Sequence, residues 1–331
     1  MPRMKSPHFI QLHHEDRQAI REELIRGLGD EPARTSPKYL YDALGSKLFE
    51  AITELPEYYP TRTEAAIFAE HGQAMSRVIP PAACLIDLGA GNCVKAANLF
   101  GRLHPSRYVA VDISVEFLRN ALDCLQRQFP ALDMLGLGVD FSSGLHLPQE
   151  ACPPDDMPRV LFYPGSSIGN FTPQEALAFL RSVRTACGPH PASGLLIGVD
   201  LVKSTQVLEA AYDDALGVTA AFNRNLLLHI NRLIGADFDI GQWEHLAIYN
   251  TALSRIEMHL QARHTLEVSW PGGNRRFVAG ERIHTENSCK WTVPDFAALL
   301  AEAGFAHSQH WLDADQRFAV FWAGATLRNP A

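Results

Sequence analysis

The sequence predicts an α/β fold that combines a doubly wound parallel sheet with a second unit of mixed helices and strands. Between residues 84 and 200, short apolar runs alternate with helical patterns, which is typical of a parallel sheet covered by helices. The glycine turn Gly89-Ala90-Gly91 directly follows the first apolar run. Beyond Asp200 this alternation stops. We therefore expect a Rossmann-like sheet that is interrupted by an inserted segment.

The N-terminal region is expected to contain two helices separated by a proline-marked link. Residues 14–28 carry apolar side chains at helical spacing, and the aromatic segment 39–49 follows the link. The second helix should run to about Val78, where a proline pair ends it. Thr61 or Thr63 is expected to be its N-cap, because a hydroxyl oxygen can accept from the first free backbone N–H groups.

Five short apolar runs predict the strands of the parallel sheet. They lie at residues 84–88, 108–111, 135–139, 160–163 and 195–199. Helices are expected between them at 95–102, after a cap at Ser114, and from Thr172-Pro173 onward. Runs of this length that end at turn residues are consistent with strands buried on both faces.

After the fifth run the pattern changes, and this change defines the expected domains. Residues 204–237 look mainly helical, whereas 247–266 and 277–285 look like strands. A helix beginning at Val293 and a strand at 318–322 then resume the earlier pattern. We expect one domain formed by 63–200 plus 290–328 and a second formed by 8–62 plus 201–289.

Composition and charge exclude several classes of protein. The 331 residues carry a formal net charge of −8, so a general nucleic-acid binder with a basic face is not expected. None of the six cysteines forms a Cys-x-x-Cys pair, so no metal site is expected. No apolar run approaches the roughly 20 residues that a membrane span needs, and the N-terminus does not resemble a signal peptide. We therefore expect a cytoplasmic protein that binds neither membrane nor nucleic acid.

The glycine turn predicts a nucleotide-like ligand. Glycine allows the backbone to approach a ligand closely, and Asp112, about 20 residues on, ends the second strand where it can accept from ribose hydroxyls. Dinucleotide sites prefer a third glycine, but Val94 stands there. The turn therefore favours a nucleoside cofactor without pyrophosphate. A tight turn in an unrelated α/β domain is the alternative.

Two other strand ends carry candidate ligand groups. Asp140-Phe141 follows the third strand, and a loop of small residues that includes Asn170 follows the fourth. Ligands of open α/β sheets bind outside the carboxyl ends of the strands. Both groups are therefore candidates. The alternative is that Asp140 is an ordinary loop acid, Phe141 a core residue and Asn170 a turn residue.

Several long strings, far apart in the chain, carry a family resemblance. They are 36–42, 55–64, 165–170, 200–203, 212–215, 217–225, 255–258 and 285–290. On these strings, nearly the whole chain resembles the L-histidine Nα-methyltransferases of ergothioneine biosynthesis. The resemblance implies a Rossmann-like class I methyltransferase sheet with S-adenosylmethionine (SAM) as cofactor. It also implies a second α+β domain, formed by the N-terminal segment and the insertion, that binds histidine.

The activity implied by the resemblance is trimethylation of the α-amino group of L-histidine to hercynine, the first step of ergothioneine biosynthesis. The mono- and dimethyl forms would then be substrates too, and a monomer is expected. Asn170 and Tyr212 would hold the substrate carboxylate, and Glu286 and Ser288 would bind the imidazole. Met258 would pack on the ring.

The resemblance also assigns residues around the reacting amine. Tyr58 would contact the amino acid through water, and Tyr41 and Phe49 would shape the space beside the amine. Gly165 would offer its carbonyl to the amine. Tyr41 and Tyr58 are the catalytic candidates, but the sequence identifies no dedicated base. Aromatic faces suit a trimethylated cation, which has no N–H to donate.

On the cofactor side the resemblance implies Gly89, Lys95, Asp112, Asp140 and Phe141. Asp140 would accept from the adenine amine, and Phe141 would cover the ring. The turn departs from the family pattern, since both glycines and the lysine are present but three hydroxyl side chains are missing. Cofactor binding is therefore expected to rely on the backbone of the turn.

The sequence leaves three alternative functions. A related enzyme that methylates the α-amine of another aromatic amino acid, such as tryptophan, is the first, and Glu286 with Met258 argues for histidine instead. A non-catalytic methyltransferase-like binding protein is the second, and retention of Asp112, Asn170 and Tyr212 argues against it. A nicotinamide oxidoreductase is disfavoured by the missing third glycine.

Overall fold

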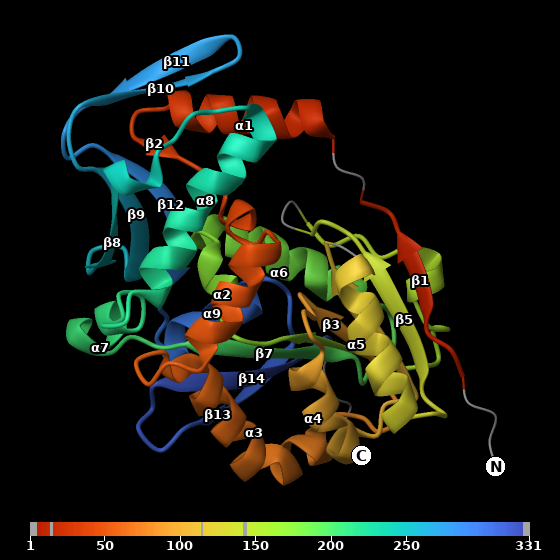
Figure 1. Cartoon of the computed structure of the whole chain (residues 1–331). Coiled ribbons are helices and arrows are strands. Elements are labelled where there is room, and N and C mark those ends of the chain that lie inside the picture. Colours follow the sequence, from red (N-terminus) through yellow and green to blue (C-terminus); the bar gives the residue numbers. More distant parts are fainter. Residues whose placement is uncertain (1–4, 14–15, 114, 142–143, 327–331) are drawn as a thin grey trace.

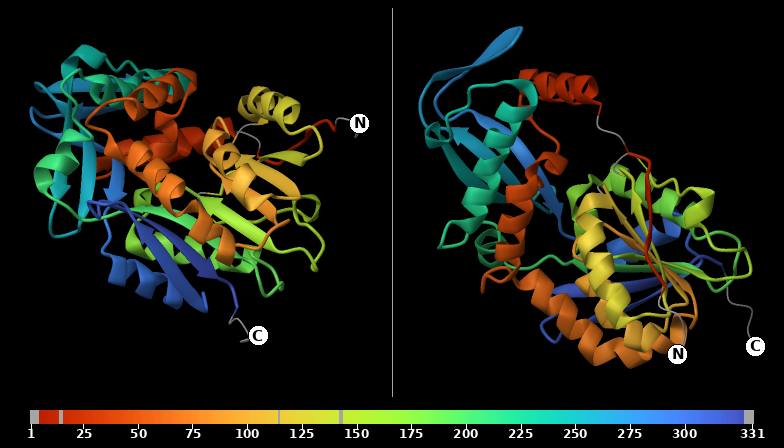
Figure 2. Two further views of the ribbon diagram at one scale, coloured as in Figure 1. Left: turned by 90° about the horizontal axis from the view of Figure 1, so that it is seen from below. Right: turned by 45° about the vertical axis from the view of Figure 1, so that its right-hand side comes forward.

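The computed structural model describes residues 5–13, 16–113, 115–141 and 144–326 of the chain. Two units, each built on its own sheet, lie side by side in Figures 1 and 2. The expected helix cap at Ser114 lies outside the described residues, as do the last two residues of the expected first domain. No helix in the described part of the chain is both long and apolar enough to span a membrane.

The larger unit is built on an eight-stranded sheet, and this confirms the predicted α/β fold class. Its spatial order is β1 (His8–Gln11), β5 (Asp133–Gly138), β4 (Arg107–Asp112), β3 (Cys84–Leu88), β6 (Arg159–Tyr163), β7 (Gly194–Asp200), β14 (Phe318–Gly324) and β13 (His307–Leu312). The first six strands are parallel, and β14 and β13 close the sheet antiparallel. The carboxyl ends of the parallel strands therefore share one edge, where a ligand site is expected.

Helices cover both faces of the larger sheet. On one face lie α3 (Tyr59–Val78), α4 (Val94–Leu103) and α5 (Val115–Gln128), and on the other lie α6 (Pro173–Ala186) and α9 (Val293–Glu302). Successive strand residues alternate between the two cores, so Leu85 packs with the first group and Ile86 with the second. Both side chains are fully buried, which explains why the strand reads as a continuous apolar run.

The smaller unit is built on a four-stranded sheet with its own apolar core. The strand order is β2 (Ala33–Arg34), β12 (Arg282–Cys289), β9 (Arg255–Ala262) and β8 (Trp243–Asn250). Its helices are α1 (Arg17–Gly29), α2 (Ala43–Thr53), α7 (Thr205–Ala210) and α8 (Val218–Ile234). The hairpin of β10 (Leu266–Trp270) and β11 (Gly273–Phe277) projects from this unit in Figure 1. Among the described residues, the 3-10 turns are η1 (Pro37–Leu40), η2 (Gln149–Ala151), η3 (Ser167–Asn170) and η4 (Ile240–Gln242).

Two predicted helix starts have different outcomes. Thr172 caps α6 as expected, because its hydroxyl accepts from the Glu175 N–H and the Glu175 carboxylate accepts from the Thr172 N–H at 2.8 Å. The cap predicted at Thr61 or Thr63 is wrong, since α3 begins at Tyr59. Pro60 lies in its first turn, where the missing N–H costs nothing.

The strand β1 corrects one boundary of the expected second domain. Residues 8–11 were assigned to that domain, but they pair in parallel with 135–138 at the edge of the larger sheet. Gly136 makes room for the ring of Phe9, because a Cβ there would lie 2.7 Å from it. A four-residue edge strand has no local signal that reveals its partner, so only the tertiary contact places it.

Candidate functional site

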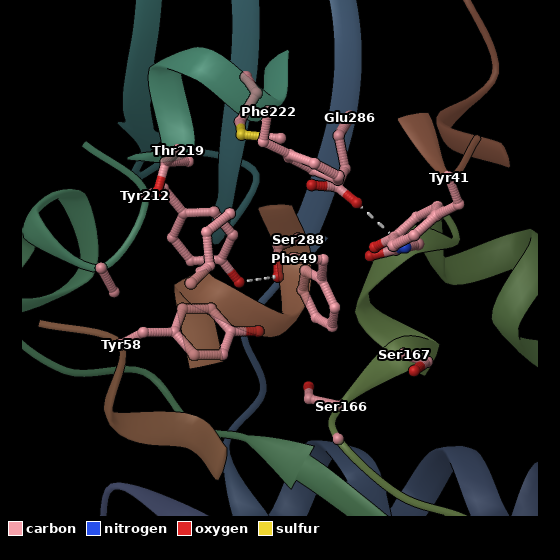
Figure 3. A pocket seen from close by; sticks show the side chains of 15 residues that line it. Tyr41, Phe49, Tyr58, Ser166, Ser167, Tyr212, Thr219, Phe222, Glu286 and Ser288 are labelled. Carbon is pink, nitrogen blue, oxygen red and sulfur yellow. Dashed lines mark hydrogen bonds between the residues drawn. The ribbon is translucent and has the colours of Figure 1, made fainter. Parts of the chain in front are cut away.

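A pocket between the two units contains all nine residues that the sequence assigned to the amino acid. These nine are Tyr41, Phe49, Tyr58, Gly165, Asn170, Tyr212, Met258, Glu286 and Ser288. Six further residues complete the lining, namely Ile52, Ser166, Ser167, Ala211, Thr219 and Phe222. Figure 3 shows that side chains of both units point toward one another here. The pocket therefore depends on both units, and residues far apart in the sequence form it.

Strand β12 aims two polar side chains into the pocket. Glu286 and Ser288 are two residues apart, so the pleat of the strand puts them on the same face. Met258 of β9 lies directly opposite Glu286 in the antiparallel ladder. The register of the ladder shifts between His284 and Glu286, which changes the face that the following residues present.

Glu286 is a buried carboxyl group at the end of the pocket. It is 7% exposed, and burial raises its pKa to about 7 despite the nearby Lys290 ammonium. The Asn170 side-chain amide donates to Glu286 Oε1 at 3.2 Å, and a dashed line starts at Glu286 in Figure 3. The second carboxyl oxygen remains available to a ligand that carries an N–H donor.

Tyr212 and Ser288 form a hydroxyl pair beside Glu286. Their oxygens are 2.7 Å apart, and the Lys290 ammonium donates to Ser288 Oγ at 2.7 Å and to Tyr212 Oη at 3.1 Å. Lys290 was not among the residues predicted from the sequence, although it ends one of the matched strings. A fully buried lysine next to a pocket needs partners, and only the structure shows which ones it has.

Aromatic rings form the wall of the pocket opposite these polar groups. Phe49 lies edge-on to Tyr41 at 5.5 Å and to Tyr58 at 6.1 Å between ring centroids, and Phe222 is 5.5 Å from Tyr41. Burial, with Tyr212 adding to it, holds the pKa of Tyr58 well above its usual value. Tyr58 is therefore a neutral phenol, and ring faces of this kind attract cations.

The glycine turn, the end of β4 and Phe141 lie together at the carboxyl edge of the larger sheet. Gly89 and Gly91 have φ angles of +71° and +53°, the left-handed region that glycine tolerates. The Gly91 N–H donates to Asp112 Oδ2 at 3.0 Å, and the Ile113 N–H donates to Oδ1 at 2.8 Å. A Cβ on Gly89 would meet only Phe141, at 3.9 Å. This open turn with an acid and a ring fits a nucleoside.

Lys95 lies between this turn and the amino-acid pocket, where it contacts Glu64, a residue that was not predicted from the sequence. Its ammonium pairs with Glu64 Oε2 at 2.8 Å, and Glu64 is 1% exposed. The other oxygen of Glu64 accepts from the Gly165 N–H at 2.7 Å. Glu64 therefore joins the predicted cofactor lysine to the predicted amine loop. Its place inside a matched string was the available signal.

We predict that Gly198→Ala destabilises the protein, because a Cβ at Gly198 would lie 2.0 Å from Glu64 Oε1. The carboxylate would have to leave Gly165 and Lys95, at a cost of about 2–3 kcal/mol in unfolding free energy. Urea denaturation measures this loss. Gly101→Ala is the matched control, since nothing lies within 4 Å of its Cβ, and it should be neutral or stabilising. Equal midpoints for Gly198→Ala and the parent chain would contradict the packing argument.

The described residues contain no group of three His, Cys, Asp or Glu side chains placed to hold a metal ion. Comparison with known proteins identifies the family of this chain. The family described as "Histidine-specific methyltransferase, SAM-dependent" matches residues 20–325. This match covers both units and includes every residue that lines the pocket.

Individual relatives are similar over most of this chain. Histidine N-alpha-methyltransferase of Mycolicibacterium smegmatis is 38% identical over 304 residues, which are 89% of this chain and 92% of the relative. The protein with the same name from Mycobacterium tuberculosis is 37% identical, over 89% of this chain and 91% of its own length. Ergothioneine biosynthesis protein 1 of Neurospora crassa is 30% identical over 85% of this chain, which corresponds to 32% of that longer protein.

Proposed function

Because this chain belongs to the family of histidine-specific, SAM-dependent methyltransferases, we propose that its pocket holds L-histidine while the glycine turn holds SAM. The protein is a SAM-dependent histidine methyltransferase of the ergothioneine type. The α-amine is the acceptor, and we propose that it is methylated three times, giving hercynine. One observation carries the substrate assignment, namely the buried Glu286 carboxyl group opposite Met258.

In this proposal Glu286 and Ser288 recognise the imidazole ring. A carboxylate that accepts from an imidazole N–H makes a charge-assisted hydrogen bond, and this bond is strong in a buried site. Met258, which is 1% exposed, lies opposite Glu286 on the neighbouring strand and supplies an apolar surface for the ring. An amino acid without a ring N–H would leave the carboxyl group unpaired, which disfavours it.

Asn170 and Tyr212 would hold the substrate carboxylate. Asn170 ends η3 and Tyr212 follows α7, so they approach the pocket from different units. Each of them already contacts a residue that is proposed to bind the imidazole. Asn170 donates to Glu286, and the Tyr212 hydroxyl oxygen lies 2.7 Å from Ser288 Oγ. The carboxylate and imidazole subsites are therefore adjacent, which suits an amino acid whose ring and carboxylate are a few bonds apart.

Around the amine, Tyr41, Phe49 and Tyr58 would form an aromatic wall and the Gly165 carbonyl would accept from the N–H groups. SAM supplies a methyl group on a positively charged sulfur when it is bound. The amine must present a free lone pair, so it loses a proton before it reacts. Tyr58 stays protonated and can accept a hydrogen bond through its oxygen, but it cannot act as a phenolate base. Positioning is therefore the main contribution of these residues.

On the cofactor side Gly89 would give the backbone close approach, Asp112 would accept from both ribose hydroxyls, and Asp140 and Phe141 would bind and cover the adenine. Lys95, already paired with Glu64, would place positive charge near the methionine carboxylate. We propose that the larger unit is the SAM-binding domain and that the smaller unit is the histidine-binding domain. We propose that the enzyme is a monomer.

Incubation of the purified protein with SAM and each amino acid, followed by mass spectrometry, tests the proposal. Histidine should gain one, two and then three methyl groups, and the trimethyl product should accumulate. Tryptophan is the informative competitor, since its indole presents a ring N–H on a larger ring. Preferred methylation of tryptophan would overturn the histidine assignment, and absence of any methylated amino acid would overturn the enzyme assignment.

The pKa of Glu286 predicts a pH dependence of histidine binding. Below about pH 7 its carboxyl group is protonated in the free protein, so the charge-assisted bond is lost. The Kd for histidine should therefore rise between about pH 8 and about pH 6, as Glu286 becomes protonated. Glu286→Gln removes the protein contribution, so its profile should be flatter. Identical profiles measured by calorimetry would contradict the assigned titration.

A further inference from the structure

A buried group of charges lies directly behind the amino-acid pocket. Asp200, at the end of β7, is 1% exposed and contacts two ammonium groups: Lys290 at 2.8 Å and Lys203 at 2.6 Å. The Tyr59 hydroxyl also donates to this carboxylate, at 2.7–2.8 Å. These four residues join the end of the larger sheet to the residue that follows β12, and the proposed function gives them no role.

Lys290 directs its donors toward the pocket rather than toward solvent. Its side chain is fully buried, and its three N–H groups match three acceptors: Asp200 Oδ2, Ser288 Oγ and Tyr212 Oη. Two of these acceptors are hydroxyl groups that line the pocket. The lysine therefore connects a buried carboxylate on one unit with the hydroxyl pair that faces the ligand.

The hydroxyl pair of Tyr212 and Ser288 has two O–H hydrogens, and its contacts determine where each of them points. Tyr212 and Ser288 each have one O–H, and each oxygen accepts one hydrogen bond from Lys290. Their oxygens are 2.7 Å apart, so one hydroxyl donates to the other. One O–H remains. It finds no acceptor on the side that faces Lys290, because the ammonium group there has only N–H donors. That hydrogen therefore points toward the pocket, where it requires an acceptor on the ligand.

In this arrangement Lys290 stays a charged ammonium group and Tyr212 stays a neutral hydroxyl. Burial alone would lower the pKa of Lys290, but the adjacent Asp200 carboxylate outweighs it and raises that pKa. Burial also raises the pKa of Tyr212, so this side chain stays a neutral hydroxyl. A hydroxyl whose oxygen accepts from an ammonium is polarised and donates more strongly.

We propose that Lys290 is a positioning residue for histidine binding, which orients the Tyr212–Ser288 pair so that it presents one strong O–H donor to an acceptor of the amino acid. The acceptor is the carboxylate or the unprotonated ring nitrogen. This inference rests on the proposed function, since it assumes that histidine occupies the pocket. It assigns specificity to a residue that never touches the substrate.

Comparison with Lys203 distinguishes orientation of the hydroxyl pair from simple neutralisation of Asp200, because both lysines contact this carboxylate. Its ammonium contacts the same carboxylate and is also largely buried, with 9% of the side chain exposed. Its other contacts are the Tyr59 hydroxyl and the Leu201 carbonyl, and neither belongs to the pocket lining. A purely structural role would therefore be shared by both lysines, whereas orientation of the hydroxyl pair belongs to Lys290.

The test compares Lys290→Met with Lys203→Met as the matched control, and measures the KM for histidine together with the Kd for SAM. Lys290→Met should raise the KM for histidine by about 10-fold or more, with the Kd for SAM unchanged within about twofold. Lys203→Met should leave both values unchanged within about twofold. An equal rise in the KM for both variants would overturn the inference.

The double variant Asp200→Asn/Lys290→Met keeps the test valid if Lys290→Met alone does not fold. In Lys290→Met the buried Asp200 carboxylate keeps Lys203 as its ammonium partner but loses the second one, and Asp200→Asn removes the need for that second partner. Thermal stability should therefore be higher in the double variant than in Lys290→Met, while the KM for histidine stays high. Recovery of the parent KM would overturn the inference, because Lys290 would then serve only to neutralise Asp200. Failure of the proposed function itself is distinguishable, since the parent protein would then not methylate histidine.

Discussion

Glu286→Ala should lower kcat/KM for histidine by about 100-fold while the Kd for SAM changes by less than about twofold. The substitution leaves the imidazole N–H without its acceptor in a buried pocket, and an unpaired buried group costs about 1–3 kcal/mol, more when its partner was charged. It also releases the Asn170 amide, which donates to Glu286 at 3.2 Å. Steady-state kinetics and calorimetry with each ligand measure the two effects separately.

Glu286→Gln is the matched control for the charge. The amide has the same shape and can still accept from the imidazole, so its loss should lie between those of the parent and the alanine variant. A general disturbance of the pocket would affect both substrates alike. Equal losses of histidine and SAM binding in Glu286→Ala would therefore contradict the assignment of this residue to the ring.

Asp112→Ala should weaken SAM binding by on the order of 100-fold, because two contributions disappear together. The carboxylate would no longer accept from the ribose hydroxyls, and the Gly91 and Ile113 N–H groups would lose their acceptor. Calorimetric titration with SAM measures the change in Kd.

Two controls accompany this variant. Asp112→Asn keeps one carbonyl acceptor and should show a smaller loss. Asp133→Ala removes another carboxylate from the same sheet. Asp133 begins β5 and pairs with Arg107, at the edge of the sheet opposite to Asp112. This variant should leave the Kd for SAM unchanged. An unchanged Kd in Asp112→Ala would mean that the turn binds something other than a nucleoside.

Local pattern was enough to predict the parallel sheet. β3 occupies residues 84–88 as expected, and the two glycines that follow it do adopt positive φ angles. Strands buried on both faces are continuously apolar, and such runs are visible in the sequence alone. The same reasoning missed β1, because an edge strand of four residues is defined by its partner β5 and not by its own pattern.

The nine pocket residues could be named from the sequence only because their strings resemble a family. Nothing local in Tyr58 or Met258 separates a binding residue from a core residue. The structure brings all nine residues into one lining. Their individual roles remain predictions, and the variants of Glu286, Asp112 and Lys290 are the direct tests.

The sequence by itself therefore determined the fold class, the glycine turn and, through resemblance, the family and its chemistry. Only the tertiary structure decided which charges are paired behind the sites. Glu64 contacts Lys95, which lies 31 residues away in the sequence, and Gly165, which lies 101 residues away. Asp200, at the end of β7, contacts Lys290, which directly follows β12. A buried charge is tolerated only beside its partner, and that partner is selected by folding in three dimensions rather than by spacing along the chain.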